Sequence, residues 1–269
     1  MRKLAAILFL LVSVLSLRAQ DFSQIDSLMG VYVKAIQTEG TESKTAEVDY
    51  MIGASKDPAT RKHIALWLFD YYKDSPLMGE EAVALHIYDS WLSGDSGLGF
   101  RSEFDGFDAK LFADFNRTSL IGMQAPRVTL RRPCKGKVTV PASGRTSLLW
   151  FYDTSCSKCT LEAKVLPGVL DKEASVPVDF YAIYTGQDKK QWKAFRRKFR
   201  LENKNIRLVH LWDPEIESDY LRLYGVVSTP KLYMVEPGGS IIGRRLEVEN
   251  LPQMFSLAAQ IESLYKHSK

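Results

Sequence analysis

Two cysteines separated by two residues are the strongest candidates for reactive residues in this sequence. Cys156-Ser157-Lys158-Cys159 follows the apolar run at 148–152 and opens a segment with helical periodicity. A cysteine at a helix N-terminus faces free backbone N–H groups and the positive end of the helix dipole, which both stabilise a thiolate, and Lys158 adds a nearby positive charge. The arrangement predicts that Cys156 is an exposed nucleophile. It also predicts that Cys159, one turn further on, is a more buried thiol able to resolve a mixed disulfide.

Other roles for such a pair fit the sequence less well. A c-type haem site has a histidine directly after the second cysteine, but Thr160 stands there. A structural zinc site needs four ligands, and neither Cys134 nor the four histidines form a second pair at ligand spacing. A static disulfide is an open alternative, although so short a loop gains little entropy from closure. We therefore expect a redox-active pair with no metal and no cofactor. Cys134 is interpreted as an unreactive thiol in a hairpin, with a role as a third redox partner left open.

Residues 1–20 have the pattern of a cleavable export signal. Arg2 and Lys3 precede an apolar or small run at 4–17, and Ala19 offers a small residue for signal peptidase. An uncleaved membrane anchor is the alternative, but the run fits it less well because it is shorter than the roughly 20 residues that span a bilayer. Cleavage would leave 33 basic against 32 acidic residues, a balance that gives no reason to expect a nucleic-acid partner.

The remaining chain divides into a helical part and an α/β part. Its 269 residues are 45% hydrophobic and 25% charged, which excludes disordered, fibrous and multispan membrane classes. Residues 21–121 show apolar spacings of three and four, and Asp57-Pro58 marks a helix start. From residue 122 onward strands alternate with helices. Strands are expected at 128–130, 138–140, 148–152, 178–184, 207–212, 231–235 and 240–243, and helices from 156, at 188–202, at 218–223 and from 250. The expected fold class is α/β, a mixed sheet flanked by helices at 122–269 after a small all-helical domain at 21–121.

Residues 122–269 resemble a thioredoxin-like domain of the TlpA/ResA group of exported thiol–disulfide oxidoreductases, which is related to the AhpC/TSA proteins. The resemblance lies in Gly122-Met-Gln-Ala-Pro126, in the strand leading into the cysteine pair, and in Tyr224-Gly-Val-Val-Ser-Thr-Pro230. It implies a cis Pro230 beside Cys156, with the Thr229 backbone free to pair with an extended substrate segment.

The same resemblance assigns further residues to the site. Glu162 stands where the group often has an acid that moves a proton to or from the buried thiol; an ordinary solvated helix residue is the alternative. Ser157 and Lys158, between the cysteines, are expected to tune the redox potential. The sequence departs from the family at Trp150, in place of a buried acid, and at Ser155, in place of a tryptophan.

These observations predict an exported thiol–disulfide oxidoreductase of the periplasm that reduces protein disulfides, with electrons from a membrane-bound donor. One alternative is a partner-binding or assembly protein with a thioredoxin-like scaffold. A peroxiredoxin-like peroxidase fits less well, because Thr154 and Cys156 match a T-x-x-C arrangement with one residue missing. The basic stretch 189–200 is interpreted as a solvated face over a packed aromatic edge, with binding of anions or anionic lipid as the alternative.

Overall fold

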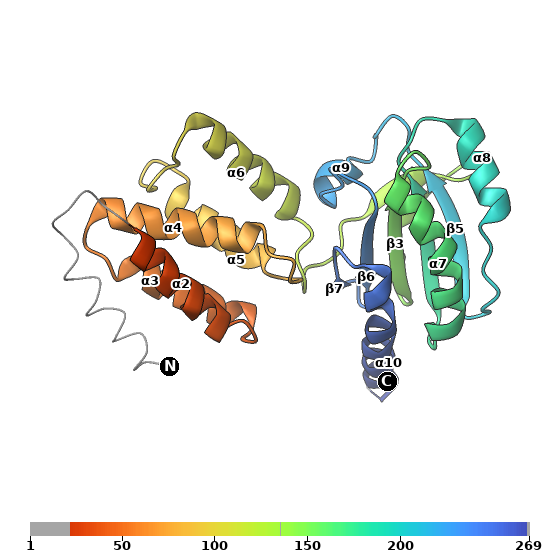
Figure 1. Ribbon diagram of the computed structural model, residues 1–269. Coiled ribbons are helices and arrows are strands. Elements are labelled where there is room, and N and C mark those ends of the chain that lie inside the picture. The colour runs from red at the N-terminus through yellow and green to blue at the C-terminus, as the bar shows by residue number, and fades with distance from the viewer. Residues whose placement is uncertain (1–21, 135, 268–269) are drawn as a thin grey trace. The chain divides into compact units, whose positions relative to one another are not determined.

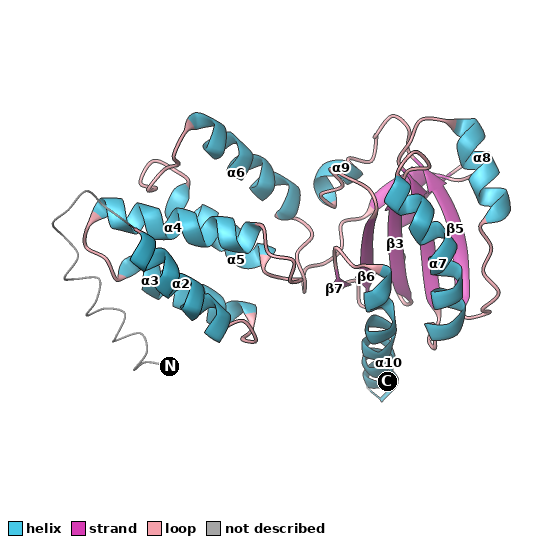
Figure 2. Ribbon diagram, viewed as in Figure 1, coloured by secondary structure: helices cyan, strands magenta, loops and turns pink. Residues whose placement is uncertain are grey.

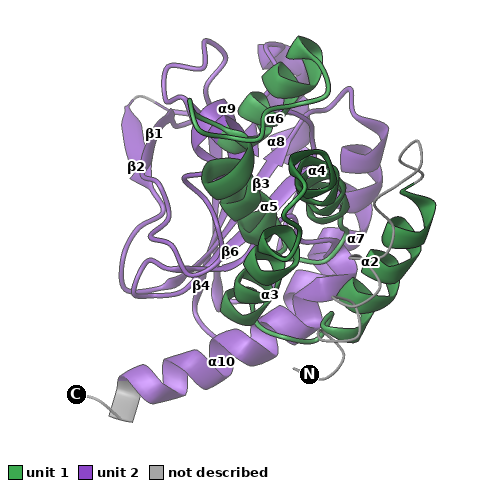
Figure 3. Cartoon of the chain, turned by 90° about the vertical axis from the view of Figure 1, so that its left-hand side faces the viewer, with its two compact units in different colours: residues 1–113 green, residues 114–269 purple. Residues whose placement is uncertain are grey.

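The computed structural model describes residues 22–134 and 136–267, so the predicted signal at 1–20 lies outside the described residues. By its internal contacts the chain divides into two compact units between Ala113 and Asp114 (Figure 3). The sequence predicts a domain boundary between residues 121 and 122. Within the described residues, no helix is both long and apolar enough to cross a membrane.

The first unit consists of helices, as predicted (Figure 2). They are α2 (Ser23–Ala35), α3 (Thr41–Gly53), α4 (Pro58–Lys73), α5 (Glu81–Ile87), a π-helical turn (Tyr88–Leu92) and α6 (Glu103–Asn116), which continues into the second unit. Asp57 caps α4, because its carboxylate accepts a hydrogen bond of 2.8 Å from the Thr60 N–H and Pro58 takes the first helical position. Buried side chains of α2 to α5, among them Met29, Ile52 and Leu68, form one core.

The second unit is built on one mixed sheet with helices packed around it (Figure 1). Its seven strands have the order β2-β1-β5-β4-β3-β6-β7. The strands are β1 (Val128–Arg131), β2 (Lys137–Val140), β3 (Thr146–Tyr152), β4 (Val178–Tyr184), β5 (Ile206–Trp212), β6 (Lys231–Val235) and β7 (Ile241–Gly243). The three central strands β3, β4 and β5 are parallel, and the remaining pairings are antiparallel. The predicted α/β class with a mixed sheet is confirmed.

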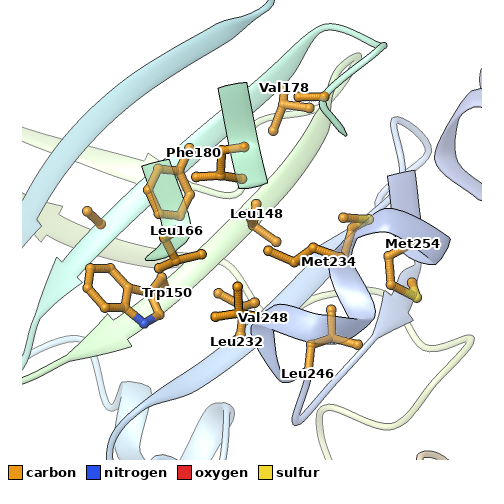
Figure 4. Packing of buried hydrophobic residues seen from close by; sticks show 14 of the residues in the cluster. Leu148, Trp150, Leu166, Val178, Phe180, Leu232, Met234, Leu246, Val248 and Met254 are labelled. Atoms are coloured by element: carbon orange, nitrogen blue, oxygen red, sulfur yellow. The ribbon is translucent and has the colours of Figure 1, made fainter. Parts of the chain in front are cut away.

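Helices cover both faces of this sheet. Because successive side chains of a strand point to opposite faces, Leu148 and Trp150 pack against α7 (Ser157–Glu173), α8 (Lys189–Lys198) and α10 (Leu251–His267) (Figure 4). Phe151 belongs to the core on the opposite face, beneath α9 (Tyr220–Leu223). β3 is buried along its whole length, as a central strand covered on both faces must be.

Two helices differ from their predicted form. α8 ends at Lys198 rather than near residue 202, and Phe199 adopts an extended backbone with its ring packed against Trp150 and Phe180. The apolar spacing that buries Phe255 and Ala258 of α10 continues to Leu264, but Leu264 is 68% exposed. The last turns of α10 extend away from the centre of the sheet (Figure 3), and there Tyr265 reaches the turn between β6 and β7, where its hydroxyl hydrogen-bonds Glu236.

Candidate active site

The buried strand β3 delivers the cysteine pair to the start of α7. The connection is a tight turn, because the Asp153 carboxylate accepts hydrogen bonds of 2.8 Å from both the backbone N–H and the hydroxyl of Ser155. The Cys156 N–H donates to the Asp153 carbonyl at 3.3 Å. Cys156 is thereby fixed as the residue that caps α7, with an extended backbone.

The sulfur of Cys156 lies at the helix N-terminus that the sequence predicted. It accepts a hydrogen bond of 3.1 Å from the backbone N–H of Cys159, and a thiolate at this position would gain from that bond and from the helix dipole. The Cys156 thiol also donates to the carbonyl oxygen of Thr229, at 3.3 Å. The Thr229–Pro230 peptide bond is cis. The fold therefore brings Cys156, Thr229 and Pro230 together across 73 residues of sequence.

The two thiols have unequal environments. Cys159 is buried and only 2% exposed, whereas Cys156 is partly accessible. Burial raises the pKa of the Cys159 thiol to about 12, and the hydrogen bond to Cys156 acts in the same direction. Both cysteines are free thiols in this structure. The arrangement provides one accessible sulfur beside a hydrogen-bond donor and one protected sulfur beneath it.

Glu162 is a buried carboxyl group and not a solvated helix residue. Its side chain is on α7, three residues after Cys159, and the residue is 7% exposed. Its carboxyl oxygen accepts a hydrogen bond of 2.9 Å from the indole N–H of Trp150. Burial raises the pKa of Glu162, while the Trp150 hydrogen bond opposes that rise. Trp150 on the buried strand β3 thus holds the acid of the neighbouring helix α7 through its indole N–H.

Both residues between the cysteines are exposed. The Lys158 ammonium forms an ion pair of 2.6 Å with Glu247, which raises the pKa of Lys158. The sequence analysis missed Glu247, because it lies 89 residues from Lys158 and has no motif around it. The carboxylate of Glu247 also contributes to the raised pKa of Glu162, and Lys158 opposes it. Through Lys158 and Glu247, the segment before α10 therefore influences the pKa of Glu162.

The third cysteine lies apart from the pair. Cys134 is exposed in the turn between β1 and β2, and strands β5 and β4 separate that edge hairpin from β3. His63 and His86 bind Asp26 and Asp49 in the helical unit. In the part of the chain that the structure describes, no three histidine, cysteine or acidic side chains gather as a metal site would require.

Comparison with known proteins identifies the fold. Residues 135–255 match the family model of the thioredoxin-like domain. A thioredoxin-like protein from Bacteroides caccae superposes with a TM-score of 0.66 at 14% identity, over 88% of this chain and 85% of the other. That coverage includes the helical unit as well as the sheet unit.

Other solved structures match a smaller part of the chain. The thioredoxin domain of a thiol-disulfide oxidoreductase from Bacteroides vulgatus is 21% identical, with a TM-score of 0.43 over 51% of this chain and 95% of its own. StoA from Bacillus subtilis is 14% identical, with a TM-score of 0.38 over 48% of this chain and 96% of its own. No protein of curated function matches the sequence.

Proposed function

Because this chain contains a thioredoxin-like domain, we propose that it is a thiol–disulfide oxidoreductase whose reactive couple is Cys156 and Cys159. One observation supports this most directly. The accessible Cys156 sulfur accepts the Cys159 N–H at the start of α7 and lies against the carbonyl before the cis Pro230. A thiolate stabilised by a helix N-terminus and a second thiol one turn away are what two-step disulfide exchange requires.

The proposed reaction transfers two electrons from the dithiol to a substrate disulfide. The Cys156 thiolate attacks one substrate sulfur, forms a mixed disulfide and releases the other substrate sulfur as a thiolate. Deprotonated Cys159 then attacks the Cys156 sulfur, which completes the Cys156–Cys159 disulfide and releases the second substrate thiolate. The released thiolates take up protons from water. The protein ends oxidised and the substrate reduced.

The second step needs a base, because the Cys159 pKa of about 12 leaves little thiolate near neutral pH. We propose that Glu162 accepts this proton. Its carboxyl group lies on the same helix face one turn beyond Cys159, and burial raises its pKa toward the range useful for proton transfer. The indole N–H of Trp150 holds the carboxyl group in position.

Substrate binding in this proposal uses the backbone beside Pro230. An extended segment of the substrate would pair with the backbone at Thr229, in the manner of strand addition, and thereby present its disulfide to Cys156. Ser157 and Lys158 would tune the potential of the couple. The substrates would be protein disulfides.

We further propose that the mature protein works outside the cytoplasm, in the periplasm, with a membrane-bound donor restoring the dithiol. The pattern at residues 1–20 supports export. The domain limits proposed from the sequence are the signal at 1–20, the helical domain at 21–121 and the thioredoxin-like domain at 122–269.

The midpoint potential of the couple tests the proposal. Protein lacking residues 1–20 is equilibrated in graded thiol/disulfide buffers, and free thiols are counted by alkylation. We expect a two-electron couple near about −270 mV, the range of thioredoxin reductants; a value near about −120 mV would indicate an oxidant that installs disulfides. A Cys159→Ser variant should accumulate the mixed disulfide with a model substrate, and Cys156→Ser should not.

If the pair never titrates as a two-electron couple, the oxidoreductase proposal fails. The partner-binding scaffold would then be the better description, and Cys156→Ser protein should retain its function in the cell. Peroxide turnover by the purified protein would instead favour the peroxidase alternative.

A further inference from the structure

Helix α8 has an exposed surface of a single charge sign. Six basic side chains of the helix and its end are exposed and form what we call the α8 basic face: Lys189, Lys190, Lys193, Arg197, Lys198 and Arg200. The sequence from 189 to 200 contains no acidic residue. Among the described residues, no carboxylate lies within ion-pair distance of any of these six side chains. Most of this positive charge therefore has no ion-pair partner in the described part of the unit, although the Arg200 guanidinium donates to the carbonyls of Arg196 and Phe199 at the end of the helix.

Part of this charge arrangement works against the stability of the helix, although Arg197 and Lys198, in the last turn, suit the negative end of the helix dipole. Lys189, Lys193 and Arg197 follow one another at four-residue spacing, where like charges repel. Lys189 and Lys190 also occupy the first turn, at the positive end of the helix dipole, where basic residues are unfavourable. The helix is held by its other side, because Trp192 and Phe199 are buried in the core of the sheet unit. Acidic residues in the first turn would suit a purely structural helix better than Lys189 and Lys190 do, which leaves room for another role of the positive charge at that end.

The basic face begins beside the cysteine loop. The hydroxyl of Thr154, two residues before Cys156, donates a hydrogen bond of 2.6 Å to the side-chain carbonyl of Gln191 in the first turn of α8. Asp188 fixes the same turn, because its carboxylate accepts hydrogen bonds from the N–H groups of Lys190 and Gln191 at 2.7 and 3.1 Å. The start of α8 is thus tied to the loop that presents the reactive sulfur.

We propose that the α8 basic face is a docking surface for acidic protein partners of the cysteine pair, so that disulfides flanked by acidic residues react preferentially. This inference rests on the proposed function. An anionic protein segment next to the disulfide would be attracted along the helix while its sulfur approaches Cys156. Charge of one sign around a reactive centre can raise association rates by about 10- to 1000-fold, and salt removes the effect.

A protein partner fits this face better than a lipid surface does. Peripheral membrane helices bury aromatic or aliphatic side chains in the bilayer interface, whereas Trp192 of α8 and Phe199 directly after it are buried in the protein core, and Phe195 packs against that core. Trp192 is 2% exposed and Phe199 is 4% exposed. The α8 basic face therefore attracts a partner through charge alone. Because the face begins beside the cysteine loop, it can attract the same partner whose disulfide reacts with Cys156.

Peptide disulfides that differ only in flanking charge provide the test. Pre-reduced protein is mixed with peptides in which glutamate, glutamine or lysine flanks the same disulfide, at low and at high salt. We expect the acidic peptide to be reduced at least about tenfold faster than the neutral one at low salt, and the difference to vanish at high salt. The Lys189→Glu/Lys193→Glu variant should reverse this preference, while the matched Lys34→Glu/Lys56→Glu variant should retain it.

The neutral peptide separates the two proposals. Equal rates for all peptides, with the neutral one reduced normally, would overturn the docking surface and leave the oxidoreductase intact. Failure to reduce any peptide would overturn the proposed function and, with it, this inference. Binding of the wild-type protein, but not of the Lys189→Glu/Lys193→Glu variant, to phosphatidylglycerol vesicles without any peptide preference would show a lipid-binding face and overturn the protein-docking role.

Discussion

The unequal burial of the two thiols predicts a large difference in their alkylation rates. The pKa of Cys159 rises from 9.0 to about 12, and three pKa units reduce its thiolate fraction at pH 8 about a thousandfold. Alkylating reagents react with the thiolate and need access to it. Cys156 is partly accessible and accepts the N–H of Cys159. Allowing for local opening of the first turn of α7, we expect Cys159 to react at least about a hundredfold more slowly than Cys156.

The assay uses fully reduced Cys134→Ser protein, so that only the pair is labelled. Iodoacetamide is added in excess at pH 8, samples are quenched over time, and mass spectrometry of the peptides reports each site. The same protein unfolded in guanidinium is the control, in which both thiols should react at similar rates because burial is removed. Comparable rates for Cys156 and Cys159 in the native protein would refute the assignment of an accessible nucleophile and a protected resolving thiol.

Three further predictions concern buried polar groups. Trp150→Phe removes the N–H that binds the buried Glu162 carboxyl, so guanidinium unfolding should show a loss of about 1–3 kcal/mol; unchanged stability would contradict this role for the bond. Burial and the charges of two neighbouring arginines lower the pKa of His210 to about 4. The unfolded chain then takes up a proton near pH 6.5 that the folded chain takes up only near pH 4, so stability should fall as the pH drops between these values, by at most about 3 kcal/mol. In His210→Leu protein this part of the pH dependence should be absent from unfolding curves, and its persistence would exclude His210 as the source. Lys44 and Glu80 form a buried ion pair of 2.7 Å in the helical unit, so Lys44→Met should cost about 3–5 kcal/mol by leaving a buried carboxylate unpaired, while Lys44→Met/Glu80→Leu should recover most of the loss. A double variant as unstable as the single one would show that lost packing, and not the unpaired charge, causes the effect.

Local sequence patterns predicted most of the secondary structure. The apolar run at 148–152 predicted a strand buried on both faces, and Asp57-Pro58 predicted the start of α4; both are present. These signals succeed because strand alternation, helix periodicity and capping depend on residues only a few positions apart. The spacing of Cys156 and Cys159, at the junction of strand and helix, likewise predicted which sulfur is accessible and which is buried.

Where local periodicity continued beyond the packed unit, the same reasoning failed. Leu264 follows the apolar spacing of α10 but is 68% exposed, because burial depends on what packs opposite each turn and not on the spacing itself. α6 runs through the point at which the chain divides into two compact units, so no loop marks that division in the sequence, and the domain boundary at residues 121–122 stays a prediction.

The sequence by itself determined which two cysteines form the proposed couple, the strand and helix that present them, and the loop ending at Pro230. A family resemblance implied that Pro230 lies beside Cys156, but only the tertiary structure decided which groups contact the two sulfurs and the residues between them. The Thr229 carbonyl reaches Cys156 from 73 residues away, and Glu247 reaches Lys158 from 89 residues away. The physical reason is that burial and charge pairing, which set the pKa values of Cys159 and Glu162, arise from the packing of elements distant along the chain, and residue spacing does not encode those distances.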